Sequence, residues 1–161
     1  MIRPATAADT DGVLAIWNDA IRNTSVTFNP VEKKPAEFAA LLGDKAAQTH
    51  PFLVGVEGDT VLGFATYGPF RNGLGYGRTM EHSILLAPEA QGKGLGRGLM
   101  EALFAHGRAH GIHSLWAGVS GENPDAKAFH ARLGFEEVAV LREVGFKFGR
   151  WMDLTLMRKA L

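Results

Sequence analysis

With 161 residues and no internal repeat, the chain fits a single domain over residues 1–161 and is too short for two ordinary ones. A hydrophobic fraction of 46% and a charged fraction of 21% exclude a disordered or fibrous chain, and seventeen basic residues balanced by seventeen acidic ones argue against a nucleic-acid or anionic-membrane binder. The absence of cysteine excludes disulfides, thiolate metal sites and a cysteine nucleophile, and it suits a cytoplasmic protein.

The chain is expected to begin with a short strand and an amphipathic helix. Residues 1–5 have the pattern of a strand and lack the apolar run of a signal peptide. Apolar residues then recur at helical spacing, which predicts a helix that Asp9 or Thr10 caps and that ends near residue 22 or 23.

Periodicity and turn residues predict the other elements, in chain order: a helix over 35–47, strands over 51–56, 60–67 and 79–87, a helix over 95–110, a strand over 113–120, a helix over 124–133, and strands over 135–144 and 151–157. Turns are expected at 57–59 and 145–149. The loop after the first helix is expected to expose Phe28 and Asn29, and the glycine-rich segment 68–77 to form a mobile surface loop. No stretch is long enough to span a bilayer.

The most informative segment is Gln91-Gly92-Lys93-Gly94-Leu95-Gly96, which connects a predicted strand to a predicted helix. A glycine-rich turn at a helix N-terminus presents backbone N–H groups and the positive end of the helix dipole, and both suit a phosphate group. Lys93 and Arg97 can add charge. The segment lacks the Gly-Lys-Ser/Thr ending of phosphate-loop NTPases and the third glycine of the dinucleotide motif. The alternative is that its glycines only allow a tight strand-to-helix turn.

Several landmarks extend this signal over nearly the whole chain. Gln91-x-x-Gly94-x-Gly96 resembles the acetyl-CoA pyrophosphate signature of the GNAT acetyltransferase superfamily. Asn123 followed by Phe129-His130-Ala131-Arg132-Leu133-Gly134-Phe135 resembles the next landmark of that superfamily. Glu81-His82-Ser83, Arg71 and the segment 144–151 resemble its phosphinothricin and methionine sulfoximine acetyltransferase subgroup.

This resemblance implies an α/β fold of the α+β type, in which a mixed, mostly antiparallel sheet of about seven strands is splayed at the strand carrying Glu81 and flanked by about four helices. Acetyl-CoA would lie in the split, and the protein would be a homodimer. The residues expected to bind the cosubstrate are Ile84, Leu85, Leu86, Gln91, Gly92, Lys93, Gly94, Leu95, Gly96, Arg97, Asn123 and His130. The residues expected to face the acceptor are Phe28, Arg71, Asn72, Gly73, Glu81, His82, Ser83, Lys147 and Arg150.

Glu81 is the predicted catalytic base. Attack on a thioester requires a neutral amine, so a base must take a proton from the α-ammonium group. Glu81 lies in a mostly apolar strand, where partial burial would raise the pKa of its carboxyl. Strand alternation places Glu81 and Ser83 on one face and His82 on the other. The alternative is a carboxylate that only pairs with Arg71 or Arg78.

His130 is the second catalytic candidate. Many members of the superfamily have a tyrosine in the helix before Leu-Gly-Phe, which protonates the departing thiolate, and this chain has His130 there. His130 either donates that proton, only contacts the cosubstrate, or packs as a buried histidine. His106 and His110 lie four residues apart on one predicted helix, but no carboxylate converges on them, and no metal is predicted.

The acceptor is predicted to be a small amino-acid-like amine. The basic groups of Arg71, Arg78, Lys147 and Arg150 suit carboxylate, phosphinate or sulfone oxygens, as found in phosphinothricin, methionine sulfoximine and methionine sulfone. The predicted reaction is direct attack of the deprotonated amine on the thioester. The alternatives are acetylation of a protein or peptide amine and a non-catalytic acyl-CoA-binding module.

Overall fold

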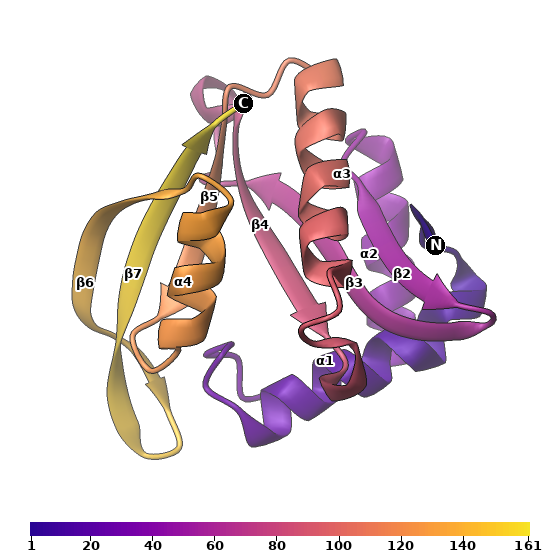
Figure 1. Cartoon of the computed structure of the whole chain (residues 1–161), viewed down its shortest axis with the longest axis horizontal. Helices are drawn as coiled ribbons and strands as arrows, with labels where there is room; N and C mark the ends of the chain where they lie inside the picture. The colour runs from indigo at the N-terminus through magenta and orange to yellow at the C-terminus, as the bar shows by residue number, and fades with distance from the viewer.

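Seven strands form one sheet, and four α-helices lie on its two faces (Figure 1). The structure is a computed structural model that describes every residue from Met1 to Leu161. In chain order the elements are β1 (Ile2–Pro4), α1 (Thr10–Asn23), α2 (Pro35–Ala47), β2 (Phe52–Glu57), β3 (Thr60–Pro69), β4 (Thr79–Leu86), α3 (Leu95–Ala109), β5 (Ser114–Ser120), α4 (Pro124–Arg132), β6 (Glu136–Lys147) and β7 (Arg150–Ala160). None of the helices is both long and apolar enough to cross a membrane.

The strands follow the order β1-β2-β3-β4-β5-β7-β6 across the sheet. Every neighbouring pair is antiparallel except β4 and β5, which are parallel. This topology confirms the expected mixed, mostly antiparallel sheet of seven strands with four helices. β6 forms one edge of the sheet, and β1 forms the other.

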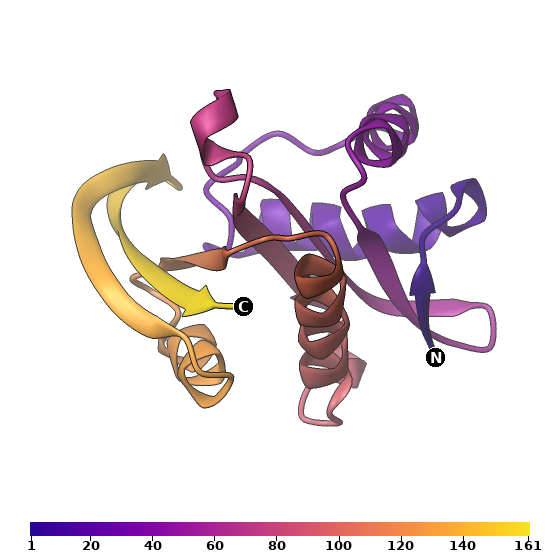
Figure 2. The same ribbon diagram turned by 90° about the horizontal axis from the view of Figure 1, so that it is seen from above.

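Two hydrophobic clusters hold the helices to opposite faces of the sheet (Figure 2). On one face, Val13 of α1 and Phe38 of α2 are fully buried against Phe64 of β3. On the other face, Leu99 and Leu103 of α3 pack in a cluster with strand residues; the strand residues of this cluster include Ala65, Tyr67, Met80, Leu115, Ala117, Val119 and Met157. Alternate residues of β3 and β4 therefore belong to different cores, as expected for strands buried on both sides.

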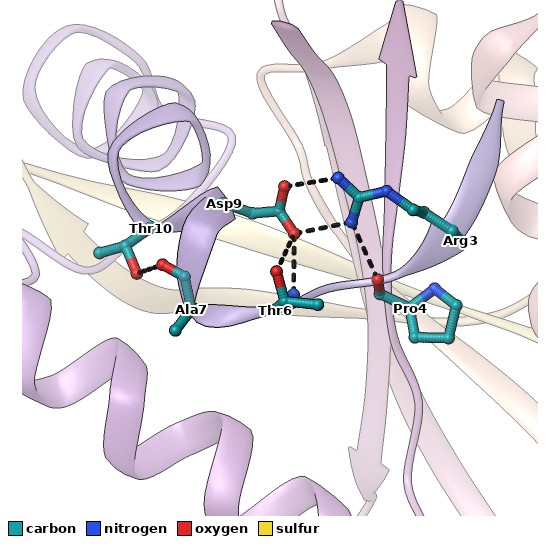
Figure 3. Close-up of polar contacts among 6 residues, drawn as sticks. All are labelled: Arg3, Pro4, Thr6, Ala7, Asp9 and Thr10. Atoms are coloured by element: carbon teal, nitrogen blue, oxygen red, sulfur yellow. Dashed lines mark hydrogen bonds and ion pairs between the residues drawn. The ribbon is translucent and has the colours of Figure 1, made fainter. Parts of the chain in front are cut away.

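The entry into α1 differs in detail from the predicted cap. Asp9 precedes the helix, but its carboxylate turns back instead of binding the first helical N–H groups (Figure 3). It accepts hydrogen bonds from Arg3 at 2.8 and 2.9 Å and from the backbone N–H of Thr6 at 2.8 Å. Hydrogen bonding to the Arg3 guanidinium is the main reason why the pKa of the buried Asp9 carboxyl lies below its usual range. Asp9 thus joins β1 to the start of α1.

The C-terminal hairpin is longer than predicted. The sequence placed a five-residue turn at 145–149, but β6 continues to Lys147, which pairs with Arg150 of β7. Only Phe148 and Gly149 form the turn, with φ values of 53° and 73°. Positive φ at both central residues matches the twist of a two-residue hairpin, but phenylalanine rarely takes this conformation, so the pattern did not reveal the turn.

Candidate active site

The sheet divides between β4 and β5. The two parallel strands pair only from Thr79 to Glu81 on β4 and from Ser114 to Trp116 on β5. Beyond these residues the strands diverge (Figure 1), while β4 stays paired with β3 as far as Leu86 and β5 stays paired with β7 as far as Ser120. The expected splay at the strand carrying Glu81 is therefore present, and the backbone of residues 82–86 has no β5 partner.

The glycine-rich turn lies beyond the end of β4 and leads into α3. Gly92 and Gly94 have φ values of 73° and 85°, a left-handed conformation that residues with a side chain rarely adopt. No acceptor in the protein receives the backbone N–H groups of residues 92–97. These amides, together with the dipole of α3, form a site that suits an anion. Lys93 is exposed beside it, while Arg97 pairs with Glu101 at 2.8 Å.

Two of the later glycines have a different role from Gly92 and Gly94. A Cβ on Gly96 would lie 3.2 Å from Leu86 and 3.4 Å from Phe129, and a Cβ on Gly98 would lie 2.9 Å from Ile2. Gly96 and Gly98 therefore allow α3 to pack closely, and Gly96 brings together β4, α3 and α4. Ile84 and Leu86 pack on this α3 face and Leu85 on the α1 face, so contact with a cosubstrate in the split falls to their backbone.

Asn123 holds the start of α4 at the end of β5. Its side-chain carbonyl accepts a hydrogen bond from the backbone N–H of Ala126 at 3.1 Å, which makes Asn123 the N-cap of the helix. Pro124 at the first helical position adds to this signal. The predicted landmark is therefore also the structural device that brings α4 beside the start of α3.

Glu81 lies on the face of β4 turned toward α1, opposite to His82. The residue is exposed, yet burial of its carboxyl by the surrounding protein raises the pKa of Glu81, and the Arg71 guanidinium partly opposes that rise. No ion pair joins Glu81 to Arg71 or Arg78. A Cβ on Gly118 would lie 3.4 Å from the Glu81 carboxylate, so the side chain reaches across to β5. This is the environment of a proton acceptor that substrate can approach.

Three residues around Glu81, namely Phe70, Trp116 and Gly118, were not predicted from the sequence to lie at the site. Trp116 pairs with Glu81 in register, and Gly118 follows it on the same face of β5. The Phe70 ring lies 5.0 Å from the Trp116 ring, and the Arg71 guanidinium lies over Phe70 at 5.2 Å. Strand alternation would have identified Trp116 and Gly118 once β4 and β5 were recognised as parallel neighbours. Asn72 and Gly73 are exposed in the adjoining segment.

His82 and His130 come together on the opposite, α3 and α4 face. Their Nε2 atoms lie 2.9 Å apart, and both side chains are buried. Their Nδ1 atoms lie 3.0 and 2.7 Å from the carbonyl oxygens of Trp116 and Ala126. Burial and both hydrogen bonds turn the His82 ring away from the Glu81 face, and its predicted contact with the acceptor stays a prediction.

The basic residues of the C-terminal hairpin are engaged within the protein. Lys147 is buried and donates hydrogen bonds to the carbonyl oxygens of Thr24 and Thr27 at 2.6 and 2.8 Å. Arg150 makes a two-point ion pair with Glu122 at 2.6 and 2.9 Å. The Lys147 ammonium thus holds the loop after α1, and its predicted contact with an acceptor anion stays a prediction. Phe28, from that loop, is half-buried against Gly145.

Comparisons with known proteins agree with this geometry. The sequence pattern of the Acetyltransferase (GNAT) family matches residues 16–135. The chain is 41% identical over 158 residues to an L-methionine sulfoximine/L-methionine sulfone acetyltransferase of Pseudomonas aeruginosa, a match that covers 98% of this chain and 92% of the relative. It is 36% identical over 160 residues to the L-amino acid N-acyltransferase MnaT of Escherichia coli, with 99% and 93% covered.

Two solved structures show the same fold. A ribosomal-protein-alanine N-acetyltransferase from Brucella melitensis has a TM-score of 0.97 at 39% identity, with 100% of this chain and 99% of that chain covered. A phosphinothricin acetyltransferase from Sinorhizobium meliloti in complex with acetyl-CoA has a TM-score of 0.95 at 33% identity, with 100% and 88% covered. The chain therefore belongs to the GNAT acetyltransferase family, and its chemistry is acetyl-CoA-dependent N-acetylation.

Proposed function

We propose that this protein transfers the acetyl group of acetyl-CoA to the α-amino group of a small amino-acid-like acceptor of the methionine sulfone, methionine sulfoximine or phosphinothricin type. The observation that carries the proposal is the Glu81 carboxyl, which is free of ion pairs, has a raised pKa and lies where β4 and β5 divide. A base with a raised pKa takes a proton from an ammonium group more readily than an ordinary carboxylate does. The names of the Pseudomonas and Sinorhizobium proteins support this acceptor class.

The donor half of the proposed site uses backbone groups. The unpaired N–H groups of residues 92–97 would hold the pyrophosphate of acetyl-CoA, with Lys93 beside it. The backbone of residues 84–86, which β5 leaves unpaired, would bind the pantetheine arm, and the side-chain amide of Asn123, at the N-cap of α4, would contact it. This arrangement would place the thioester carbonyl between β4 and β5, close to Glu81.

The acceptor half lies on the α1 face of the sheet. Glu81 would remove a proton from the acceptor ammonium, and the neutral nitrogen would attack the thioester carbon, so that the C–S bond breaks and its electron pair goes to sulfur. Arg71 would bind an acidic group of the acceptor, with Asn72, Gly73 and Ser83 nearby. Phe28 would close the site against the apolar part of the acceptor. The charge of Arg150 is already neutralised by its ion pair with Glu122, so Arg150 would contribute to acceptor binding only as part of that pair.

An acceptor panel tests the proposal. Thiol release from acetyl-CoA is measured with methionine sulfone, methionine sulfoximine, phosphinothricin and unmodified methionine, each over the background of hydrolysis. At least one of the first three is expected to exceed the background strongly, with formation of the N-acetyl product. Turnover at the hydrolysis rate for every amino acid would overturn the acceptor class.

A second candidate comes from the Brucella melitensis structure, which is named as a ribosomal-protein-alanine N-acetyltransferase. A peptide with an N-terminal alanine therefore belongs in the same panel. If the peptide has a higher kcat/KM than every free amino acid, the acceptor is a protein N-terminus. The half-buried Phe28 favours the small acceptor, because a peptide needs an open path away from its N-terminal residue.

We also propose that two copies associate through the β6 side of the sheet. β6 is an edge strand, and large apolar side chains of the β6–β7 hairpin are exposed; they are Val138, Val140, Leu141, Val144, Phe146, Phe148 and Trp151. A patch of this kind on an edge strand is typical of a protein interface. Light scattering is expected to give the mass of a dimer, and Trp151→Asp that of a monomer. A monomeric wild type would overturn this proposal. The expected cytoplasmic location stays a prediction.

A further inference from the structure

A separate pocket lies at the edge of the sheet, between α2 on one face and α3 on the other (Figure 2). It has a volume of about 350 Å³ and is lined by the end of β1, the last turn of α2, the residues that lead into β2, and one residue of α3. Its lining includes three basic side chains, which are those of Lys45, His50 and His106, and no carboxylate. We refer to it as the basic pocket. None of its residues belongs to the proposed donor or acceptor site.

The three basic side chains converge on Tyr67 of β3. Lys45 Nζ donates a hydrogen bond to the Tyr67 carbonyl at 2.6 Å, and the Tyr67 and His50 rings lie 5.7 Å apart. The buried Tyr67 hydroxyl lies 2.6 Å from His106 Nδ1 and makes no other hydrogen bond. Burial raises the pKa of Tyr67 to about 12, so the hydroxyl keeps its proton and donates to His106 Nδ1. A neutral His106 therefore carries its own proton on Nε2.

The basic pocket has hydrogen-bond donors that the protein itself does not use. An ammonium group has three N–H bonds, and Lys45 uses one of them on Tyr67. His50 makes no side-chain hydrogen bond within the protein, and its Nδ1 atom is buried without a partner. His106 uses only Nδ1, which leaves its Nε2 N–H free.

These groups amount to one positive charge and two neutral donors. Burial lowers the pKa of Lys45; burial and then Lys45 lower the pKa of His50; burial, then His110 and His50, lower the pKa of His106. No acidic group opposes these shifts. Both histidines are therefore neutral near neutral pH, while Lys45, whose pKa falls from an ordinary value of about 10.4, supplies the charge. One ammonium group and two neutral N–H donors match one carboxylate better than a doubly charged phosphate.

A strained residue fixes the position of His50. The last turn of α2 is closed by hydrogen bonds from the His50 N–H to the Lys45 carbonyl at 2.8 Å and from the Thr49 N–H to the Ala46 carbonyl at 3.2 Å. This type of helix ending needs a left-handed residue, usually glycine, but here Thr49 takes that position with a φ of 57°. A β-branched residue rarely adopts this conformation, and such strain is concentrated at functional sites. The ending also occupies two carbonyl oxygens that would otherwise repel an anion.

The rest of the basic pocket is largely apolar. Leu42 of α2 and Phe52 and Leu53 of β2 are among its lining residues. Its volume of about 350 Å³ lies at the small end of the range for ligand pockets, which is about 300–1,000 Å³. The basic pocket therefore suits a small molecule with an anionic end and an apolar end.

We propose that the basic pocket binds a small monocarboxylate that has an apolar tail and no ammonium group. The carboxylate accepts hydrogen bonds from Lys45, His50 and His106, and the tail packs on the apolar lining. An ammonium group on the ligand would face Lys45 with no carboxylate of the protein to balance it. N-acetylated amino acids have this chemistry, because acetylation removes the ammonium charge and leaves the carboxylate. Their identification as the natural ligand rests on the proposed function, of which they are the products.

The first experiment compares matched ligands. N-acetyl-L-methionine is titrated by calorimetry into the wild type near pH 7, without acetyl-CoA, and saturable binding is expected. L-methionine keeps the ammonium group, N-acetyl-L-methioninamide lacks the carboxylate, and inorganic phosphate lacks the tail. Each of these is expected to bind at least about tenfold more weakly, because each loses a charge-assisted contact, adds a repulsive one or loses apolar contact. Equal binding of any of the three, or no binding of N-acetyl-L-methionine, would overturn the proposal.

The second experiment locates the ligand. In ¹H–¹⁵N spectra of the ¹⁵N-histidine-labelled wild type, N-acetyl-L-methionine is expected to shift the ring signals of His50 and His106 but not those of the exposed His113. Because the wild type is used, the folding of a variant does not enter. Binding without a shift of His50 or His106 would overturn the proposal.

The third experiment uses variants. Lys45→Met keeps the apolar stem and removes the ammonium group, so binding of N-acetyl-L-methionine should weaken at least about tenfold. Lys34→Met, at the exposed residue before α2, is the matched control and should bind like the wild type. Arg71→Ala removes a cation of the proposed acceptor site and should leave this binding unchanged. Binding that Arg71→Ala abolishes and Lys45→Met preserves would assign the ligand to the acceptor site and overturn the proposal.

The outcomes for the basic pocket and for the proposed function are independent. If the protein acetylates amino acids but N-acetyl-L-methionine does not bind beside His50 and His106, the basic pocket proposal is wrong and the proposed function stands. If N-acetyl-L-methionine binds there but the protein acetylates no amino acid, the carboxylate site stands, and the N-acetylated product is no longer its natural ligand.

Discussion

Lys147 provides a sharp test of how the acceptor side is built. The ammonium group of this buried side chain donates to the carbonyl oxygens of Thr24 and Thr27, and it lies 4.8 Å from the centre of the Phe148 ring. Lys147→Met keeps the length and apolar stem of the side chain but removes the donors. The loop after α1 would then lose its attachment to the C-terminal hairpin, and with it the support for Phe28.

The magnitude follows from the two lost hydrogen bonds. A buried acceptor left without its partner costs about 1–3 kcal/mol. Thr24 and Thr27 are only half-buried, so water can replace part of the loss, and methionine avoids the desolvation that lowers the pKa of Lys147. We therefore expect a net loss of about 1–3 kcal/mol in the free energy of unfolding. For a chain of this size, each kcal/mol lowers Tm by about 2–4 °C.

Urea denaturation and steady-state kinetics check this expectation together. The midpoint should fall with an unchanged m-value, and the KM for the acceptor should rise while the KM for acetyl-CoA stays the same. Lys127→Met is the matched control, because Lys127 makes only an exposed ion pair with Glu137, and its loss should cost at most about 1 kcal/mol. Full stability of Lys147→Met combined with loss of acceptor affinity would contradict this structural role and show that Lys147 binds the acceptor.

Three further substitutions test other parts of the site. Asp9→Asn should lower the free energy of unfolding by roughly 1–3 kcal/mol at neutral pH. Because the folded-state pKa of Asp9 is depressed, this contribution is present above about pH 4 and is lost as the pH falls further. Unfolding curves of wild type and variant should therefore differ at neutral pH and converge in acid. Gly145→Ala would place a Cβ 2.4 Å from the Phe28 ring, so kcat/KM for the acceptor should fall while acetyl-CoA binding stays unchanged. Gly43→Ala, which has open space around its Cβ, is the control and should leave kcat/KM unchanged. In Gly94→Ala the new Cβ contacts no atom, but residue 94 has a φ of 85°, which strains any residue with a side chain by about 1–2 kcal/mol. This strain should weaken acetyl-CoA binding, measured by calorimetry, about 5–30-fold. Unchanged binding would exclude the turn as the pyrophosphate site.

Features that depend on local chemistry could be predicted from the sequence. Pro35 begins α2 as its position indicated, because proline suits the first turn of a helix. The unit from β4 through the glycine turn to α3 was predicted almost to the residue, since strand periodicity, glycines and an amphipathic helix follow one another. The opposite orientation of Glu81 and His82 followed from strand alternation alone.

Features that depend on distant partners could not be predicted in this way. Lys147 bonds to a carbonyl 123 residues away, and no local pattern distinguishes such a lysine from one that binds substrate. The contact between His82 and His130 joins residues 48 apart, so the sequence showed two candidate histidines but not their shared hydrogen bond. The ion pair between Arg150 and Glu122, which are 28 residues apart, could not be predicted for the same reason.

The most direct test of the proposed mechanism is the pH–rate profile of Glu81→Gln beside that of the wild type, at saturating acetyl-CoA and acceptor. If Glu81 is the base, kcat of the variant is expected to fall about 10²–10⁴-fold, with acetyl-CoA affinity unchanged. The variant should also lack the increase in wild-type rate that accompanies ionisation of Glu81, whose pKa is raised. A variant profile that superimposes on the wild-type profile would contradict the assignment of Glu81 as the base.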